Sequence, residues 1–171
     1  MLTTLFDSEL DKVLRPKAKG KVSGLFKYPA RLQKKLDKAL AEADADPVAW
    51  VGRHREDVQL AARRPRIARK LAEEVPEFTE QEHSEFLTRY LEGTNTVGMS
   101  EEQKAKWHLW INRVIPVLKV ISAVVPPPYN LAIIALIVVL TLIDQNRLQP
   151  AELTAVFNPT PLPESTPALA V

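Results

Sequence analysis

Cysteine is absent from this 171-residue chain, and glycine is scarce, with only 5 residues. Without cysteine the chain has neither disulfide bonds nor thiolate metal sites, so both are excluded as means of stabilising it. The scarcity of glycine and the abundance of alanine, leucine, arginine and glutamate favour helices. No stretch of alternating apolar and polar residues predicts a strand, and no segment repeats. The sequence therefore predicts an all-α protein of about one domain.

The motifs of common catalytic centres are also missing from the sequence. The G-x-S-x-G motif is absent, and Gly20-x-x-x-Gly24 matches neither a phosphate-binding loop nor a dinucleotide fingerprint. The three histidines, His54, His83 and His108, lie far apart, and none belongs to a metal-binding spacing. We therefore expect a protein that is not an enzyme, with no catalytic residues, no metal ligands and no cofactor.

Charge is absent from Val120 to Ile143, and Leu131–Ile143 is apolar on every side except at Thr141. A helix that is apolar all round lies either in a protein core or in lipid. A chain this short offers few places to bury such a helix, so we predict a membrane helix within residues 126–148. The residues predicted to span the membrane are Leu131, Ile133, Ile134, Leu136, Ile137, Val138, Val139, Leu140, Leu142 and Ile143.

The hydrophobic run is short for a membrane span, and a proline triplet precedes it. Crossing the hydrocarbon core takes roughly 20 apolar residues, and Pro126–Pro128 must break or sharply kink any helix. Three geometries remain open. The first is a short tilted span with Arg147 reaching the interface, and the second is a broken span made of Ile115–Val125 and Leu131–Ile143. The third is a core helix that partner subunits bury.

The residues that flank the hydrophobic run are typical of a membrane helix. Trp107, Trp110 and Tyr129 precede it, and such rings favour the level of the lipid headgroups, although they serve equally often as core anchors. Nearly all basic residues also precede the run, which predicts a single-pass protein whose N-terminal region faces the cytoplasmic or inner side. Residues 1–14 carry three acids where a secretory signal needs an apolar core, so insertion would be late, as in a tail-anchored protein.

Proline and capping signals divide residues 1–99 into five short helices. The third predicted helix begins at Asp46-Pro47 and runs to Arg64, and Thr79–Glu82 is a capping box that opens the fifth. A second capping box, Ser100–Gln103, opens a connecting helix over residues 100–125. The predicted fold is a small helical bundle followed by the C-terminal hydrophobic helix. Residues 149–171, which are rich in proline, are predicted to form an extended arm.

The connecting helix carries apolar residues at alternating steps of four and three. This spacing predicts a seam that packs on another helix, either in the core of the bundle or against another protein subunit. The predicted contacts with other subunits are the proline-rich arm and the seam residues Trp107, Ile111, Val114 and Leu118.

All but one of the charged residues from Lys12 to Lys38 are basic. Such a segment attracts a polyanion, either nucleic acid or anionic lipid headgroups. The alternative is a solvated helix face with a loop that docks on the acidic segment Glu77–Glu102. For a second basic cluster, Arg63, Arg64, Arg66, Arg69 and Lys70, we expect an interhelical network of ion pairs with Glu73, Glu74 or the acidic segment. The residues predicted to bind a polyanion are Lys17, Lys19, Lys21, Lys27, Arg31, Lys34 and Lys35.

These features predict a non-enzymatic structural or accessory subunit of a larger assembly, anchored in a membrane by its C-terminal hydrophobic helix. A minor protein of a membrane-containing virion and a small subunit of a membrane protein complex both fit this description. One alternative is a soluble nucleic-acid-binding or packaging protein whose hydrophobic helix forms the core of an oligomer. Another is a holin-like protein that permeabilises membranes.

Overall fold

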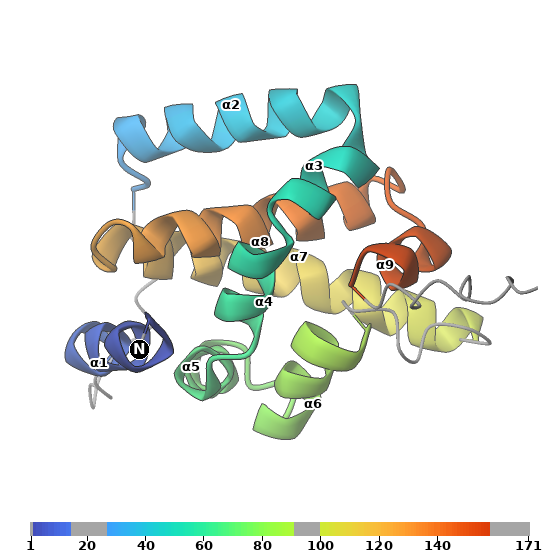
Figure 1. Cartoon of the computed structure of the whole chain (residues 1–171). Coiled ribbons are helices and arrows are strands. Elements are labelled where there is room, and N and C mark those ends of the chain that lie inside the picture. The colour runs from blue at the N-terminus through green and yellow to red at the C-terminus, as the bar shows by residue number, and fades with distance from the viewer. Residues whose placement is uncertain (1, 15–26, 91–99, 158–171) are drawn as a thin grey trace, which may run out of the picture.

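The computed structural model describes residues 2–14, 27–90 and 100–157, and all of the regular structure in these ranges is helical (Figure 1). The all-α fold class is therefore confirmed. Lys17, Lys19, Lys21 and residues 158–171 lie outside the described residues. The elements are α1 (Leu2–Val13), α2 (Ala30–Ala45), α3 (Pro47–Arg53), α4 (Arg55–Ala62), α5 (Pro65–Glu74), α6 (Glu80–Glu85), a π-helical turn η1 (Phe86–Tyr90), α7 (Glu101–Val124), α8 (Tyr129–Asp144) and α9 (Pro150–Phe157).

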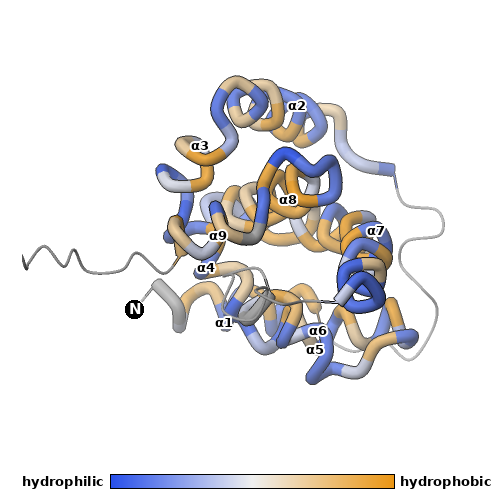
Figure 2. Tube along the Cα trace, turned by 90° about the vertical axis from the view of Figure 1, so that its right-hand side faces the viewer, coloured by the Kyte–Doolittle hydropathy of each residue, from blue (hydrophilic) through white to orange (hydrophobic). Residues whose placement is uncertain are grey.

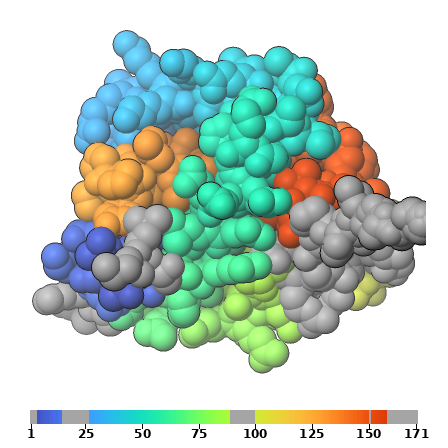
Figure 3. All heavy atoms as spheres, viewed as in Figure 1, coloured from blue at the N-terminus to red at the C-terminus, as the bar shows by residue number. Residues whose placement is uncertain are grey.

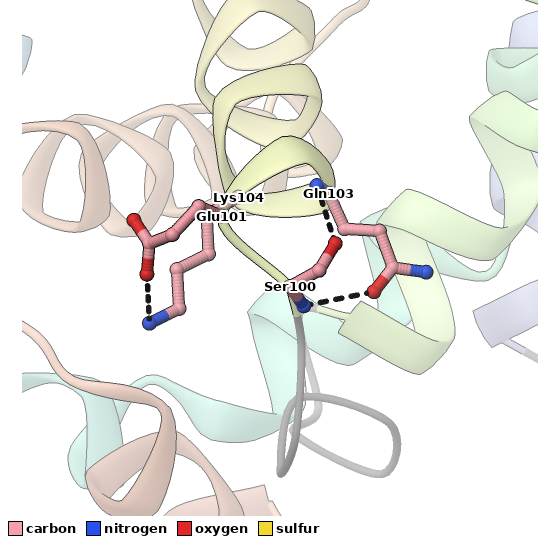
Figure 4. Close-up of polar contacts among 4 residues, drawn as sticks. All are labelled: Ser100, Glu101, Gln103 and Lys104. Carbon is pink, nitrogen blue, oxygen red and sulfur yellow. Dashed lines mark hydrogen bonds and ion pairs between the residues drawn. The ribbon is translucent and has the colours of Figure 1, made fainter.

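Both predicted capping boxes are present. The Thr79 hydroxyl accepts a bond from the Glu82 backbone N–H (3.1 Å), and the Glu82 carboxylate accepts one from the Thr79 N–H (2.9 Å). Ser100 and Gln103 exchange the same pair of bonds at the start of α7 (Figure 4). Each box satisfies two backbone donors that a helix start would otherwise leave without partners, and this fixes where α6 and α7 begin.

One predicted helix is divided in two in the structure. The segment expected to run from Asp46 to Arg64 forms α3 and α4, which meet at His54. The backbone N–H of His54 bonds to the carbonyls of both Trp50 and Val51. Neither proline nor a capping signal marks this break, so the sequence pattern contains no sign of it.

The long helix α7 passes through Pro116 without ending, and the break comes only at Pro126–Pro128. Its predicted apolar seam faces the interior of the chain itself. The seam residues are at most 3% exposed: Trp107, Ile111, Val114, Leu118, Ile121 and Val125. The seam therefore acts as a core stripe within this chain.

The hydrophobic helix α8 lies at the centre of the bundle. Its most extensive contacts are with α7, followed by α4 and α2. Figure 2 looks along α8 and shows α2, α4 and α7 arranged around it. Every residue from Ala132 to Leu140 is buried. The apolar stripes of three amphipathic helices, with residues such as Leu36, Val58 and Leu118, supply the cover that the sequence analysis expected only from lipid or partner subunits.

The segment after α8 also differs from its prediction. Residues 150–157 of the predicted arm form the helix α9, with Leu153 and Phe157 buried, and α9 packs on α3. The Glu152 side chain accepts a bond from the Gln149 N–H (2.8 Å), which is a helix-start contact. Arg147, which the sequence placed at a membrane interface, instead pairs with the side chain and the backbone carbonyl of Asp44 at the end of α2.

Candidate functional site

Five basic side chains are exposed on and just before α2. In α2, residues at positions i, i+3, i+4 and i+7 share one face, and Arg31, Lys34, Lys35 and Lys38 stand in this relation. Lys27 precedes them on the same segment. The opposite face of α2 buries Leu32 and Leu36. We call Lys27, Arg31, Lys34, Lys35 and Lys38 the basic stripe; within the described residues, none of them has a carboxylate partner.

The second basic cluster forms ion pairs, but Arg64 and Arg66 pair with α1 rather than with the predicted glutamates. Arg64 pairs with Asp7 at 3.1 Å, and Arg66 pairs with Asp11 at 2.8 Å, so α5 is held to α1 by charge. Lys70 contacts two neighbouring glutamates of its own helix. The acidic helix α6 lies on the side of the molecule opposite α2 (Figures 1 and 2). The α2 lysines thus lie away from α6, whereas residues 17–26 of the loop that was expected to dock on the acidic segment lie outside the described residues.

Apolar side chains are exposed at the end of the molecule where α2 begins. Leu5 of α1, Val124 at the end of α7 and Leu131 in the first turn of α8 are 56%, 45% and 44% exposed. The rings of Phe6 and Tyr129 stack at 5.2 Å and hold α1 against the start of α8. We call Leu5, Val124 and Leu131 the apolar end. Figure 1 shows α1, the start of α2 and the start of α8 at this end.

A hydrogen bond joins the segment before α2 to α7. The hydroxyl groups of Tyr28, two residues before α2, and Ser122 in the last turn of α7 lie 2.9 Å apart. The ammonium group of Lys119 lies over the Tyr28 ring, 5.7 Å from its centroid. Burial raises the pKa of Tyr28 above its ordinary value of 10.0, so the phenol, which is protonated at neutral pH in any case, serves as a neutral hydrogen-bonding group. The bond therefore ties the start of the basic stripe segment to α7.

The residues predicted to span a membrane have a different place in the structure. All of them except Leu131 are buried in the protein itself. In the ranges 2–14, 27–90 and 100–157, no helix is both long enough and apolar enough for a bilayer crossing. Trp107 and Trp110, predicted for the headgroup level, are 3% and 0% exposed and belong to the core, whereas Tyr129 is half-buried.

The histidines are spread over the molecule and act as structural groups. His83 is fully buried between Val75 and Trp110. His108 bonds to Asp144 at 3.2 Å, which connects α7 with the end of α8. The ring of His54 stacks on Trp50. In the part of the chain that the structure describes, no three His, Asp or Glu residues gather in a way that could hold a metal ion.

Of the seven residues predicted to bind a polyanion, the structure places Lys27, Arg31, Lys34 and Lys35 on one surface. Lys38 completes the stripe, and its i+4 relation to Lys34 was a signal that could have added it to the set. No pattern in the sequence predicts that the residues of the apolar end are exposed. Leu5, Val124 and Leu131 resemble their buried neighbours in sequence, and only the packing of the helices leaves them exposed.

Comparison with known proteins gives no relatives: no family model, no curated protein and no solved structure matches this chain.

Proposed function

We propose that this chain is a non-enzymatic protein that binds the surface of an anionic membrane through the basic stripe and the apolar end. The observation that carries the proposal is that Lys35 and Lys38, which have no carboxylate partner among the described residues, line one surface groove with the exposed Leu131 of the apolar end. Anionic headgroups attract the ammonium and guanidinium groups, and the aliphatic side chains enter the boundary between headgroups and acyl chains. Such an accessory protein can bring a larger assembly to a membrane.

This membrane contact differs from the single-pass anchor predicted from the sequence. The anchor would require α8 to leave its contacts with α2, α4 and α7, whereas surface binding leaves the bundle intact. Surface binding also uses side chains that are already exposed, so it has no unfolding cost. These two points support a peripheral mode of binding.

Nucleic acid is the competing polyanion, and the exposed groups favour lipid. Proteins that bind single strands offer aromatic rings on which bases stack. Among the side chains whose burial the structure describes, no aromatic ring is exposed; Tyr28 and Tyr129 are half-buried and engaged in the contacts given above. Exposed leucine and valine beside lysines fit the boundary of a bilayer better than a phosphodiester backbone.

The test is co-sedimentation of the full chain with vesicles of phosphatidylcholine, with and without phosphatidylglycerol. A double variant, Lys34→Gln with Lys38→Gln, removes two stripe charges. Each basic residue near an anionic surface contributes about 1 kcal/mol, so we expect binding to weaken by roughly 30-fold. The matched control, Arg53→Gln with Lys104→Gln, removes the same charge from exposed positions of α3 and α7 and should bind like the wild type.

Two results would overturn the proposal. One is equal binding to vesicles with and without phosphatidylglycerol. The other is salt-dependent binding of duplex DNA that the stripe variant loses, without any binding to vesicles, because that would identify nucleic acid as the polyanion.

A further inference from the structure

The short helix α6 and its continuation η1 lie at the edge of the bundle, and Figure 3 shows them on the lower rim of the molecule. We call them, residues 80–90, the α6–η1 segment. Its extensive contacts are internal and with α5, and it touches α4 less extensively. Hollows of about 150 and 160 Å³ open where the segment meets the start of α7 and where it meets the corner between α4 and α5. The segment is therefore loosely packed against the rest of the chain.

An aromatic cluster that includes His83 fixes this segment to α7. The His83 ring is completely buried; its Nδ1 accepts the indole proton of Trp110 at 2.8 Å, and its Nε2 donates to the Val75 carbonyl, at the end of α5, at 3.0 Å. Phe86 stacks on Trp110 at 5.1 Å, and Phe78 meets the rings of Phe86 and His83 edge-on, at 5.8 Å from each. One imidazole thus joins α5, α6 and α7.

Only the neutral form of His83 fits this cluster. An imidazolium has hydrogens on both ring nitrogens, so it cannot accept a bond from Trp110, whose indole can only donate. Its charge would also lie in a completely buried place, and burial lowers the pKa of His83 below the ordinary value of 6.5. In a solvated conformation the ring takes up a proton near that ordinary value. Acid therefore favours a conformation in which His83 leaves the cluster.

The charges around the ring do not cancel this effect. Glu82 and Glu77 favour the protonated ring, but they offset only part of the effect of burial. Each is also paired with a cation of α7 at 2.7 Å, Glu82 with Lys106 and Glu77 with Arg113. The bond from Lys106 lowers the pKa of Glu82, so this pair stays charged while His83 titrates. The other charged side chains that α5 and α6 bring to this region are Arg69, Lys70, Glu73, Glu74, Glu80 and Glu85.

We propose that the α6–η1 segment is a pH-sensitive latch, which separates from α7 when His83 takes up a proton while the rest of the bundle stays folded. The segment is the part that moves because it lies at the edge and is bordered by hollows, whereas α8 is covered by α2, α4 and α7. Opening uncovers Phe78, Phe86 and Trp110, so in mild acid the chain presents an aromatic surface that is covered at neutral pH. The latch lies opposite the basic stripe and does not depend on the proposed function.

The direction of the pH dependence follows from the lowered pKa of His83. The closed segment has its full advantage above about pH 6.5 and loses it as the pH falls toward the pKa of the buried ring. One proton separates the closed form from the open form, so in this range each pH unit favours the open form about tenfold.

The test is amide hydrogen exchange of the full chain between pH 7.5 and 5.0, with each rate compared with that of an unstructured peptide at the same pH. We expect residues 84–90 to be less protected than α8 at every pH. Their exchange should depend little on dilute urea, because a local opening exposes little surface. Below about pH 6.5 their opening should become about tenfold more frequent for each pH unit.

Two variants assign the response to His83. In His83→Gln the amide can keep the bonds to Val75 and Trp110 without ionising, so the opening should no longer depend on pH. His108→Gln removes a histidine that bonds to Asp144 outside the cluster, and it should open like the wild type. If His83→Gln does not fold, the comparison of residues 84–90 with α8 in the wild type still decides whether the segment opens alone.

Three results would overturn the latch. The first is exchange of residues 84–90 only together with α8, with equal protection and equal urea dependence, because His83 would then be exposed only by global unfolding. The second is a local opening that is equally frequent from pH 7.5 to 5.0. The third is an unchanged pH dependence in His83→Gln. Binding to vesicles bears on the proposed function alone and decides nothing about the latch.

Discussion

His83 is completely buried, and both of its ring nitrogens have partners of fixed character. The indole of Trp110 can only donate, so His83 Nδ1 accepts its proton at 2.8 Å; the carbonyl of Val75 can only accept, so Nε2 carries the hydrogen at 3.0 Å. If Nδ1 were protonated, its hydrogen would face the hydrogen of the Trp110 indole, and the hydrogen bond between them would be lost. Burial lowers the pKa of His83, and the Val75 bond and the nearby Glu82 and Glu77 offset only part of this effect.

Stability should therefore fall as the solution becomes mildly acidic. The pKa of His83 is lower in the folded chain than its ordinary value of 6.5, so the unfolded chain takes up the proton first. The contribution of the neutral ring is complete above about pH 6.5 and is lost as the pH falls toward the folded pKa. In His83→Gln the amide can keep both hydrogen bonds without ionising. We expect its melting temperature to depend less on pH between 7.5 and 5.5, measured by circular dichroism; equal dependence in both proteins would contradict this role.

The hydrogen bond between Trp110 and His83 should contribute measurably to the free energy of unfolding. Trp110→Phe leaves Nδ1 of a buried imidazole without a donor, at a cost of about 1–3 kcal/mol beyond the loss of ring volume. Trp50→Phe is the matched control, because Trp50 is equally buried and its N–H has no acceptor among the described residues. We expect Trp110→Phe to lower the free energy of unfolding in urea more than Trp50→Phe. Equal losses would show that the bond contributes nothing.

Whether α8 is a core helix or a membrane helix depends on the helices packed around it rather than on any single residue. Leu136 is completely buried and Leu131 is 44% exposed, although both belong to the same apolar run. Leu136→Ala should cost about 2–5 kcal/mol of unfolding free energy, because it leaves a cavity. Leu131→Ala should cost about 0.5 kcal/mol or less. Chemical denaturation of the two variants measures the difference. Similar small effects would contradict the core role and favour a helix that faces lipid.

The prediction of elements from sequence succeeded where the signal was local. The capping boxes at Thr79 and Ser100 were found because a hydroxyl and an acceptor three residues apart satisfy their own backbone donors. The break at Pro126–Pro128 was found because proline has no N–H. Helix α9 was missed because the prolines of residues 149–171 as a group indicate an extended arm, although Pro150 at a helix start followed by Glu152 is a helix signal.

The place of α8 could not be predicted in this way. Its apolar surface is the same whether lipid or protein covers it, and the cover comes from the neighbouring α7 together with α2 and α4, which are distant in sequence. Only one part of the candidate site could be predicted from the sequence. The basic stripe follows from helical spacing, whereas the apolar end depends on which apolar side chains the neighbouring helices leave uncovered. Local chemistry fixes helix ends, and only the assembled bundle determines which apolar side chains remain exposed.

At the scale of the whole molecule, charge gives the bundle an orientation. The free basic side chains gather on α2, whereas the arginines of α5 are paired and the acidic α6 lies on the opposite side. An anionic surface should therefore attract the face of α2 and repel the face of α6. This orientation also brings Leu131 toward the headgroups, because Leu131 lines one groove with Lys35 and Lys38, whereas Leu5 lies on α1, on the α5 side of the molecule.

A bundle that binds by this face should leave the membrane when its charges are screened. At about 1 M salt the Debye length is about 3 Å, so the attraction of the basic stripe is almost removed. We expect the full chain, floated with anionic vesicles, to be released by high salt or by an alkaline carbonate wash, with α8 still in the core. Leu131→Gln should lower the salt needed for release, because the apolar side chain that lines one groove with Lys35 and Lys38 is then lost. A chain that stays with the vesicles through the carbonate wash would mean that α8 has left the bundle, and the anchor predicted from the sequence would then be the correct mode of binding.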